Sequence, residues 1–438
     1  MPWGGVPCRR PGGAGSVSAV RRRGVIAGAA VAVAAMCAGL LAPGGTGRAV
    51  SAAPRISWGR AEALRGSPAI GGINALSCWA VSNCAAGGET TDSAFVAVER
   101  NGRWGRTERL SRVEYRIPAL VTAVSCAPGG YCVAGGNYWF KAHGEAFVAT
   151  FKKGRWQKPL EVPDTAIRDH SAAVESVSCL AARRCVVAGD NEFGAFVAGQ
   201  LNGTWQPAQT LLLGGGYTVL ACWSPLDCVA AKNLTASELN GVWGTPQAIP
   251  GTYRDQVTEV SCARDGYCAA AGFNDSNGGV YGPPFVASGP DGSFGAAVTW
   301  PGLAPGPLSC PSAGNCVMAG GSQVVSQTDG LWGTPEQLPG TWTDVTISAL
   351  SCWSAGNCAA GGSYVAVAGG RTEPFVASET NGRWSRPEPV PGSTALNKHD
   401  SDLNGVTRLS CPSRRHCTAA GTYSDAGDRQ LGFVTGPA

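Results

Sequence analysis

Beyond residue 53 the sequence has no run of eighteen or so consecutive apolar residues, which a membrane-spanning helix requires. It has no run of basic residues either, and its 28 Lys and Arg face 30 Asp and Glu. Such a near-neutral chain lacks the electrostatic footprint of a nucleic-acid-binding protein. Histidines number only four in the whole chain. The G-x-S-x-G, H-E-x-x-H and phosphate-loop motifs are missing, so the common sequence patterns of hydrolases and nucleotide-binding proteins are absent.

The first 53 residues differ in composition from the rest. Three arginines at 21–23 precede an apolar run over 25–42, and small residues follow at 51–54. This order is typical of an export signal, and Pro43 at the end of an Ala/Gly-rich run favours cleavage over retention as a membrane anchor. The pattern does not distinguish Sec from twin-arginine export.

Two segments are therefore expected, an export signal and leader at 1–53 and a single secreted domain at 54–438. The secreted domain has no predicted contact with a membrane or with nucleic acid. A monomer is expected. Gly and Ala are abundant and Arg outnumbers Lys, which indicates a GC-rich genome, such as that of an actinobacterium.

Cysteine occurs almost entirely in one repeated motif. Apart from Cys8 and Cys37 in the leader, every cysteine belongs to a C-x5-C pair, and the pairs recur every forty to sixty residues. An even number of cysteines in an exported chain predicts disulfides, whereas zinc sites usually have tighter spacing and more histidines. The predicted disulfides are Cys78–Cys84, Cys126–Cys132, Cys179–Cys185, Cys222–Cys228, Cys262–Cys268, Cys310–Cys316, Cys352–Cys358 and Cys411–Cys417.

Each repeat reads as four short β-strands. The first two flank the cysteine loop, the third contains Phe-Val-Ala or a similar triplet, and the fourth carries an aromatic residue just after a tight turn. Asn-Gly and Asp-Gly are strong hairpin turns because both residues accept a positive φ. These turns occur at Asn101, Asn202, Asn240, Asp291, Asp329 and Asn381, with a weaker Lys-Gly version at Lys153.

A four-stranded antiparallel unit of about 45 residues, copied several times, is typical of a β-propeller blade. A linear β-solenoid is the alternative, but its coils are shorter and run parallel. The last repeat ends at its third strand, near Phe433, and Trp58 supplies the missing fourth strand from the other end of the domain. The sequence thus predicts an all-β fold, an eight-bladed β-propeller with one blade closed jointly by N- and C-terminal strands.

The S-C-x5-C-x-A-x-G blocks, which run from Trp58 to the end, resemble those of exported actinobacterial cysteine-paired repeat proteins. The resemblance implies a repeat β-propeller and no particular activity.

Function is expected on one face of the propeller. Antiparallel strands place the uniform cysteine loops and Asn-Gly turns on one face, and the irregular loops on the other. Binding residues concentrate on variable loops of rigid scaffolds. Aromatic and charged residues of these loops suit sugar rings, but they suit protein partners equally. The predicted ligand-binding residues are Tyr115, Arg116, Tyr138, Trp139, His170, Tyr253, Arg254, Trp342 and His399.

Two further hypotheses concern carboxylates in these loops. The motif Asp400-x-Asp402-x-Asn404-Gly opens like a calcium-binding loop but lacks the closing Glu, so calcium is a possible cofactor. A glycosidase or lyase would need two facing carboxylates. The weak catalytic candidates are Asp169, Asp255, Asp344 and Asp400. The preferred hypothesis is a module that binds extracellular glycan or protein, and a secreted carbohydrate-active enzyme is the alternative.

Overall fold

The computed structural model describes most of the chain beyond residue 55. The described residues are 56–66, 72–90, 93–110, 119–140, 143–165, 171–252, 255–274, 282–340, 342–365, 367, 370–401 and 403–438. The predicted export signal at 1–53 lies outside them. No helix in these ranges is long and apolar enough to cross a membrane.

The described chain is a series of antiparallel sheets, as predicted, with one helical turn, α1 (Ser393–Leu396). The first strands of the repeats are β2 (Ile73–Ala80), β7 (Ala119–Ala127), β12 (Ala172–Ala181), β17 (Val219–Ser224), β21 (Gln256–Cys262), β25 (Leu308–Ser312), β30 (Thr343–Ser354) and β35 (Gly405–Ser413). The second strands are β3 (Asn83–Thr90), β8 (Tyr131–Phe140), β13 (Arg184–Asn191), β18 (Asp227–Ala231), β22 (Tyr267–Phe273), β26 (Asn315–Gly320), β31 (Asn357–Val365) and β36 (His416–Ser424).

The third and fourth strands complete each sheet on its outer side. The third strands are β4 (Ser93–Arg100), β9 (His143–Lys152), β14 (Gly194–Leu201), β19 (Thr235–Leu239), β23 (Pro284–Pro290), β27 (Gln323–Thr328), β32 (Thr372–Thr380) and β37 (Gln430–Thr435). The fourth strands are short pieces: β5 (Arg103–Trp104), β6 (Glu108–Leu110), β10 (Arg155–Trp156), β11 (Leu160–Glu161), β15 (Thr204–Trp205), β16 (Gln209–Leu211), β20 (Val242–Trp243), β24 (Val298–Thr299), β28 (Leu331–Trp332), β29 (Glu336–Gln337), β33 (Arg383–Trp384) and β34 (Glu388–Pro389).

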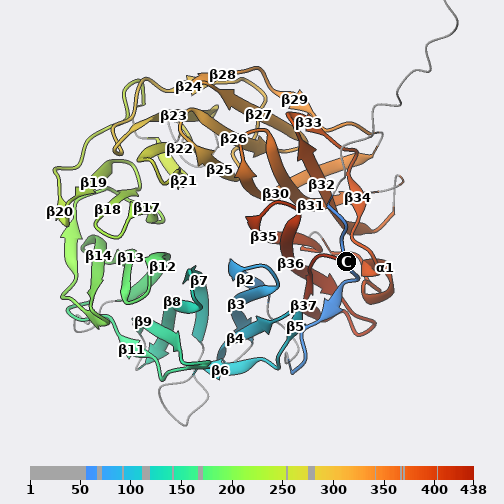
Figure 1. The fold of residues 1–438 in the computed structure, drawn as a ribbon, viewed down its shortest axis with the longest axis horizontal. Coiled ribbons are helices and arrows are strands. Elements are labelled where there is room, and N and C mark those ends of the chain that lie inside the picture. Colours follow the sequence, from blue (N-terminus) through green and yellow to red (C-terminus); the bar gives the residue numbers. More distant parts are fainter. Residues whose placement is uncertain are drawn as a thin grey trace, which may run out of the picture. The chain divides into compact units, whose positions relative to one another are not determined.

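The domain closes on itself as predicted. Each first strand contacts the first strand of the next repeat, and β35 contacts β2, which gives the ring of sheets in Figure 1. In the last sheet, β1 (Glu62–Ala63) pairs with β37 in the register Ala63 to Phe433. Trp58 forms an isolated bridge with Pro437. The fold is therefore an all-β propeller, with segments from both ends of the domain in one sheet.

Each predicted cysteine pair is disulfide-bonded, with S–S distances between 2.01 and 2.14 Å. The bond joins the first strand of a repeat to the second. In β2 and β3, for example, Cys78 pairs directly with Cys84. Disulfides of this kind are typical of extracellular proteins.

A glycine four residues after the second cysteine lets the first strand lie close to the second. A Cβ on Gly272 would lie 1.8 Å from the carbonyl oxygen of Gln256, well inside van der Waals contact. The sister glycines have the same constraint, with distances of 1.8–2.1 Å; they are Gly88, Gly136, Gly189, Gly320, Gly362 and Gly421. Lys232 is the residue at this position in the fourth repeat.

Adjacent repeats are joined by the serine that precedes the first cysteine. Ser77 Oγ accepts a hydrogen bond of 3.0 Å from the backbone N–H of Cys126 in the next repeat. Ser410 Oγ accepts one of 3.0 Å from Cys78 N–H, which links the last repeat to the first. The same bond runs from Cys179 to Ser125, Cys310 to Ser261, Cys352 to Ser309 and Cys411 to Ser351.

Hydrogen bonds also define the two faces of the domain. Gly102 N–H donates to Ser82 O (2.9 Å), so the turn after the third strand lies on the cysteine loop of the same repeat. Gly382 and Gly356 repeat this contact at 2.8 Å. We call this side the cysteine-loop face. The opposite side, with the loops between second and third strands and between repeats, is the variable-loop face.

Candidate functional site

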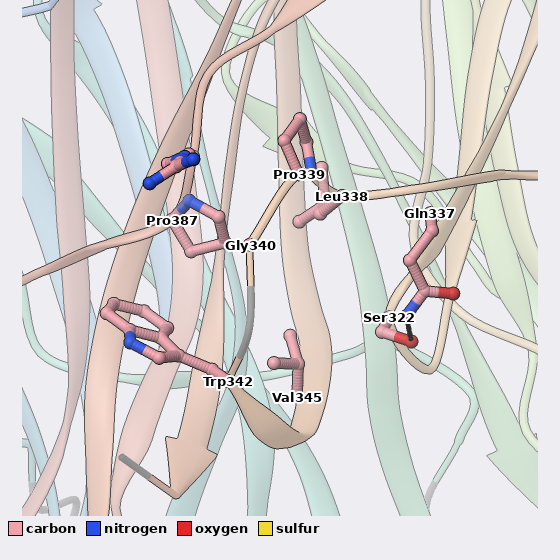
Figure 2. Close-up of a pocket in the computed structure, with 9 residues that line it drawn as sticks. Ser322, Gln337, Leu338, Pro339, Gly340, Trp342, Val345 and Pro387 are labelled. Carbon is pink, nitrogen blue, oxygen red and sulfur yellow. Dashed lines mark hydrogen bonds between the residues drawn. The ribbon is translucent and has the colours of Figure 1, made fainter.

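A pocket of about 240 Å³ lies on the variable-loop face, between the sixth and seventh repeats (Figure 2). Its lower wall comes from the segment that enters β30, with Trp342 and Val345. The remaining lining comes from the β26–β27 turn, from β29 and the residues after it, and from the gap between β33 and β34. The lining residues are Ser322, Gln337, Leu338, Pro339, Gly340, Trp342, Val345, Arg386 and Pro387.

Trp342 is held in place by stacking. Its ring lies 3.6 Å from that of Tyr364, at an interplanar angle of 14°. Tyr364 is buried and packs edge-on against Phe375, with ring centroids 6.4 Å apart. Burial, together with the charge of Glu373, raises the pKa of the Tyr364 phenol, so this support stays neutral. The indole therefore has a fixed orientation beside the pocket, facing Pro387 in Figure 2.

The other groups around the pocket are mixed in polarity. Gln337 Nε2 donates a 2.6 Å hydrogen bond to Ser322 Oγ, and the pair forms one end of the pocket (Figure 2). Arg386 adds a guanidinium, while Leu338, Val345 and the prolines are apolar. One aromatic ring, one guanidinium and an amide–hydroxyl pair can hold a small group with both an apolar face and hydrogen-bonding oxygens.

Among the predicted ligand residues that fall in the described ranges, Trp342 alone lines this pocket. Sequence analysis missed Arg386 and Gln337 because it placed function only in loops between strands. Both residues belong to fourth strands that are interrupted. Gln337 lies in β29, the second piece of the sixth repeat's fourth strand, and Arg386 lies in the gap between β33 and β34. The prolines near each of them were the available signal, since proline interrupts a strand.

Tyr138 and Trp139 are adjacent at the end of β8 but differ in surroundings. Tyr138 is buried, its hydroxyl donates to Glu145, and its ring lies 6.1 Å from that of Phe147. Trp139 is 47% exposed. Only Trp139 of this pair offers an accessible aromatic surface on the variable-loop face.

The predicted calcium loop is organised by internal hydrogen bonds. Asn404 is buried, its Nδ2 donates 3.0 Å bonds to Asn397 Oδ1 and His399 O, and its Oδ1 accepts from Ser424 Oγ at 2.9 Å. Asp400 Oδ1 accepts from Thr372 N–H at 2.8 Å. Within the described ranges no group of three or more His, Cys, Asp or Glu could hold a metal ion.

His399 lies on the surface of the same loop. Its Nε2 is 3.1 Å from Ala426 O, on the loop that follows β36. This contact links the loop before β35 to the loop before β37 on the variable-loop face.

The catalytic candidates within the described ranges, Asp255, Asp344 and Asp400, lie at or just before the first strands of three different repeats. Asp255 is buried and accepts a 2.6 Å hydrogen bond from Asn274 Nδ2. Asp344 is exposed and has a left-handed backbone with φ of 51°. The remaining predicted site residues lie outside the described ranges: Tyr115, Arg116, Asp169, His170, Tyr253, Arg254 and Asp402.

A cluster of charges around one fully buried lysine lies between the third and fourth repeats. The ammonium of Lys232, whose side chain is fully buried, pairs with the carboxylate of Asp190. Nearby, Glu175 Oε2 accepts a 2.5 Å hydrogen bond from Thr218 N–H. Burial raises the pKa of Glu175, while Thr218 and the charge of Lys232 act in the opposite direction. The signal in the sequence was Lys232 itself, at a position where every sister repeat has glycine.

A second charged pair lies on first strands of repeats that are not neighbours. Glu259 of β21 and Arg408 of β35 interact electrostatically, although β25 and β30 lie between them in the series. Burial raises the pKa of Glu259 to about 7, and the charge of Arg408 opposes the rise. Both side chains are nevertheless exposed to solvent, which screens their charges and limits this pKa shift.

No protein-family model and no curated protein matches this sequence. Solved structures do match. The structure of Sqt1 from Chaetomium thermophilum has a TM-score of 0.53 and 12% identity, and the match covers 88% of this chain and 100% of that one. A second Sqt1 structure from this organism has a TM-score of 0.51 and 11% identity, with 86% and 97% covered.

The WD40 beta propeller domain of Doa1 is a more distant match. Its TM-score is 0.41 and its identity 11%, over 70% of this chain and 93% of that one. At these identities the likeness concerns the fold alone. The ring of antiparallel sheets and the paired ends, with the fold shared with the two Sqt1 structures, define the class of the protein, a β-propeller.

Proposed function

We propose that residues 54–438 form a single secreted eight-bladed β-propeller, a binding module that recognises an extracellular glycan through the variable-loop face. The observation that carries the proposal is the Trp342 pocket. A sugar ring has an apolar face that stacks on an indole, and its hydroxyls accept and donate hydrogen bonds to guanidinium and amide groups. A volume of about 240 Å³ suits a single ring of a longer chain better than a large ligand.

The support from Tyr364 strengthens this proposal. A ring already fixed by stacking loses little freedom when a ligand binds, so less of the interaction energy is offset by ordering. Export agrees with the disulfides, which persist in oxidising compartments.

A glycan array probed with the mature protein, with and without calcium, tests the proposal. Arg386→Ala and Trp342→Ala should weaken binding to the retained glycan at least tenfold. Arg383→Ala is the matched control, because it removes the same charge from β33 without touching the pocket. Equal affinities for Arg386→Ala and Arg383→Ala would exclude the pocket. A surface protein retained in place of any glycan would instead support the protein-binding form of the module.

The alternative function is a carbohydrate-active enzyme, and one observation favours it. Glu175 and Asp190 are two carboxylates near enough for their charges to interact, and the Glu175 pKa is raised by burial, as in a general acid. Release of reducing ends from a polysaccharide that Glu175→Gln abolishes would establish it. Unchanged polymer length after prolonged incubation would leave the cluster a structural one.

A further inference from the structure

A second cavity lies on the opposite side of the domain, the cysteine-loop face. It has a volume of about 460 Å³ and is formed by the turn between β9 and β10 together with the loop between β12 and β13. Four cationic side chains line it: Lys152, Lys153, Arg155 and Arg183. No carboxylate is among the lining residues, and within the described ranges none of these four forms an ion pair.

The charge here contrasts with the charge of the domain as a whole. Residues 54–438 carry slightly more acidic than basic residues. Yet the segments 99–106, 152–158 and 181–184 contain nine Lys and Arg and a single acid, Glu99, which is buried. A cavity bordered by charges of one sign concentrates field lines and attracts counter-charged ligands.

Arg100 extends the positive charge toward the first repeat. Its guanidinium donates to Gly154 O, in the turn that borders the cavity, and lies 5.5 Å from the centre of the Phe151 ring. The cations therefore form one continuous region across three neighbouring repeats.

Backbone conformation supplies an independent observation. Lys153 has φ of 51° in a turn where the sister repeats have Asn or Asp at φ of 49–53°. Arg183 has φ of 65° in a cysteine loop where four sister repeats have glycine: Gly130, Gly266, Gly314 and Gly356. Left-handed backbone disfavours most side chains by about 1 kcal/mol or more, and Asn, Asp and Gly are the usual exceptions. Both unfavourable choices place a cation at the same cavity, which indicates selection for charge rather than for the turn.

We propose that this cavity binds the anionic groups of a linear acidic polysaccharide. A lysine and arginine lining without carboxylates suits sulfate or carboxylate groups, and the Arg183 guanidinium has further N–H donors besides the one that bonds to Asn202 O. A protein partner would need apolar or aromatic anchors. The cavity offers no accessible aromatic anchor, because its aromatic residue, Tyr131, is 8% exposed and its hydroxyl is bonded to Gln200. The spread of cations over three repeats matches the regularly spaced charges of a polymer.

The experiment measures binding of the mature protein to dextran sulfate, to neutral dextran of the same length and to polyglutamate, by calorimetry at two salt concentrations. The test variant is Lys153→Asn/Arg183→Gly, which installs the residues that sister repeats use. It should keep or raise the melting temperature and weaken dextran sulfate binding at least tenfold. The wild type should bind more weakly at higher salt, because ions screen these exposed charges.

The matched control is Arg415→Gly. Arg415 occupies the position of Arg183 in the last repeat, with φ of 62°, and does not line the cavity. The affinity of the Arg415→Gly variant for dextran sulfate should stay within twofold of the wild-type affinity. Wild-type affinity in the double variant, or an equal loss in Arg415→Gly, would overturn the assignment of the site. Polyglutamate binding as tight as dextran sulfate binding would overturn the assignment of the ligand, in favour of an acidic polypeptide.

Discussion

The fourth repeat and its seven sisters solve the same packing problem differently. In the sisters, glycine at the position of Lys232 allows the first strand, or the residues just before it, to lie close to the second strand. In six of the seven the ladder reaches this glycine, in pairs such as Val257 with Gly272, whereas in the sixth repeat it ends at Leu308 and Met318. In the fourth repeat the ladder between β17 and β18 ends one residue before Lys232, at Val219 and Ala231. The preceding residue, Thr218, bonds to Glu175 and Gly189 of the third repeat instead.

The seven glycine-containing repeats therefore share one way of packing the first two strands, and the fourth repeat departs from it. Seven repeats use the close approach of two backbones, which needs no specific partner. The fourth uses an ion pair between the fully buried Lys232 and a carboxylate of the neighbouring repeat, and it also has Ala221 where the sisters have the serine that precedes the first cysteine. Where one copy departs from a repeated rule, the departure is a candidate for function.

Loss of the Lys232 side chain should lower the free energy of unfolding the most. Lys232→Met removes a fully buried ammonium and leaves Asp190, whose side chain is 34% exposed, without its cation. Breaking this partly buried pair should cost about 3 kcal/mol, the lower end of the range for buried ion pairs. Urea unfolding of the mature domain measures it. Lys398→Met, at an exposed lysine, serves as the control and should change the free energy of unfolding by less than about 0.5 kcal/mol. A stable Lys232→Met variant would mean that the pair does not support the fold.

Replacing the glycine at this position in a sister repeat should lower the free energy of unfolding by nearly as much. Gly272→Ala places a methyl group against the carbonyl oxygen of Gln256, and the strain should lower the unfolding free energy by about 3 kcal/mol. Gly199→Ala, in β14, is the matched control because no atom lies within 4 Å of its added Cβ. If both substitutions have the same effect, the close approach of the strands does not constrain the sequence.

The repeat, the hairpins, the disulfides and the joining of the two ends were predictable because each depends on local turn chemistry or on a fixed period. Asn101-Gly102 gives a turn wherever it occurs, and Cys78 with Cys84 is close in sequence. The two cavities were not predictable in this way. The Trp342 pocket and the basic cavity each form where two repeats meet, and their shapes depend on side chains far apart in sequence.

The departures from the repeat were visible in the sequence, but their meaning was not. Lys153 could be recognised as a weak turn residue, yet only the structure places it beside Arg183 at one cavity. Likewise, the serine before each first cysteine was part of the motif, whereas its bond to the next repeat requires the ring.

A pH titration sharpens the comparison among repeats at another shared position. Opposite the fourth-strand tryptophan, some repeats have a buried glutamate, such as Glu379, and others have glutamine, such as Gln327. Burial, with the charge of Glu336, raises the pKa of Glu379 to about 7. The folded protein favours the protonated carboxyl of Glu379. The stability that this side chain contributes is therefore fully present below about pH 4.5 and is lost as the pH rises through 7.

Glu379→Gln should remove this pH dependence. Between pH 4.5 and 8 the variant should gain up to about 3 kcal/mol relative to the wild type, from about 1.4 kcal/mol per unit of pKa shift. Denaturant midpoints at several pH values measure the gain. A constant difference between variant and wild type across this range would show that the glutamate does not titrate differently on folding.

The smallest expected effect concerns the bridging serine. Ser309→Ala leaves the N–H of Cys352 without its acceptor and should cost about 1 kcal/mol. The reciprocal change, Ala221→Ser, supplies the missing hydroxyl to the fourth repeat and should be neutral or slightly stabilising. Thermal unfolding of the two variants gives the comparison. Destabilisation by Ala221→Ser would mean that the boundary after the fourth repeat has no room for the bridge.

The pairing of β1 with β37 has a consequence for biogenesis. Glu62 and Val434 are hydrogen-bonded neighbours separated by nearly the whole length of the domain. During synthesis the earlier hairpins can oxidise and stack as they emerge, because their contacts are local. The contact of β1 with β37 must wait until β37 has been synthesised. A cell that makes this protein has to keep an unsealed spiral soluble until β37 has been made.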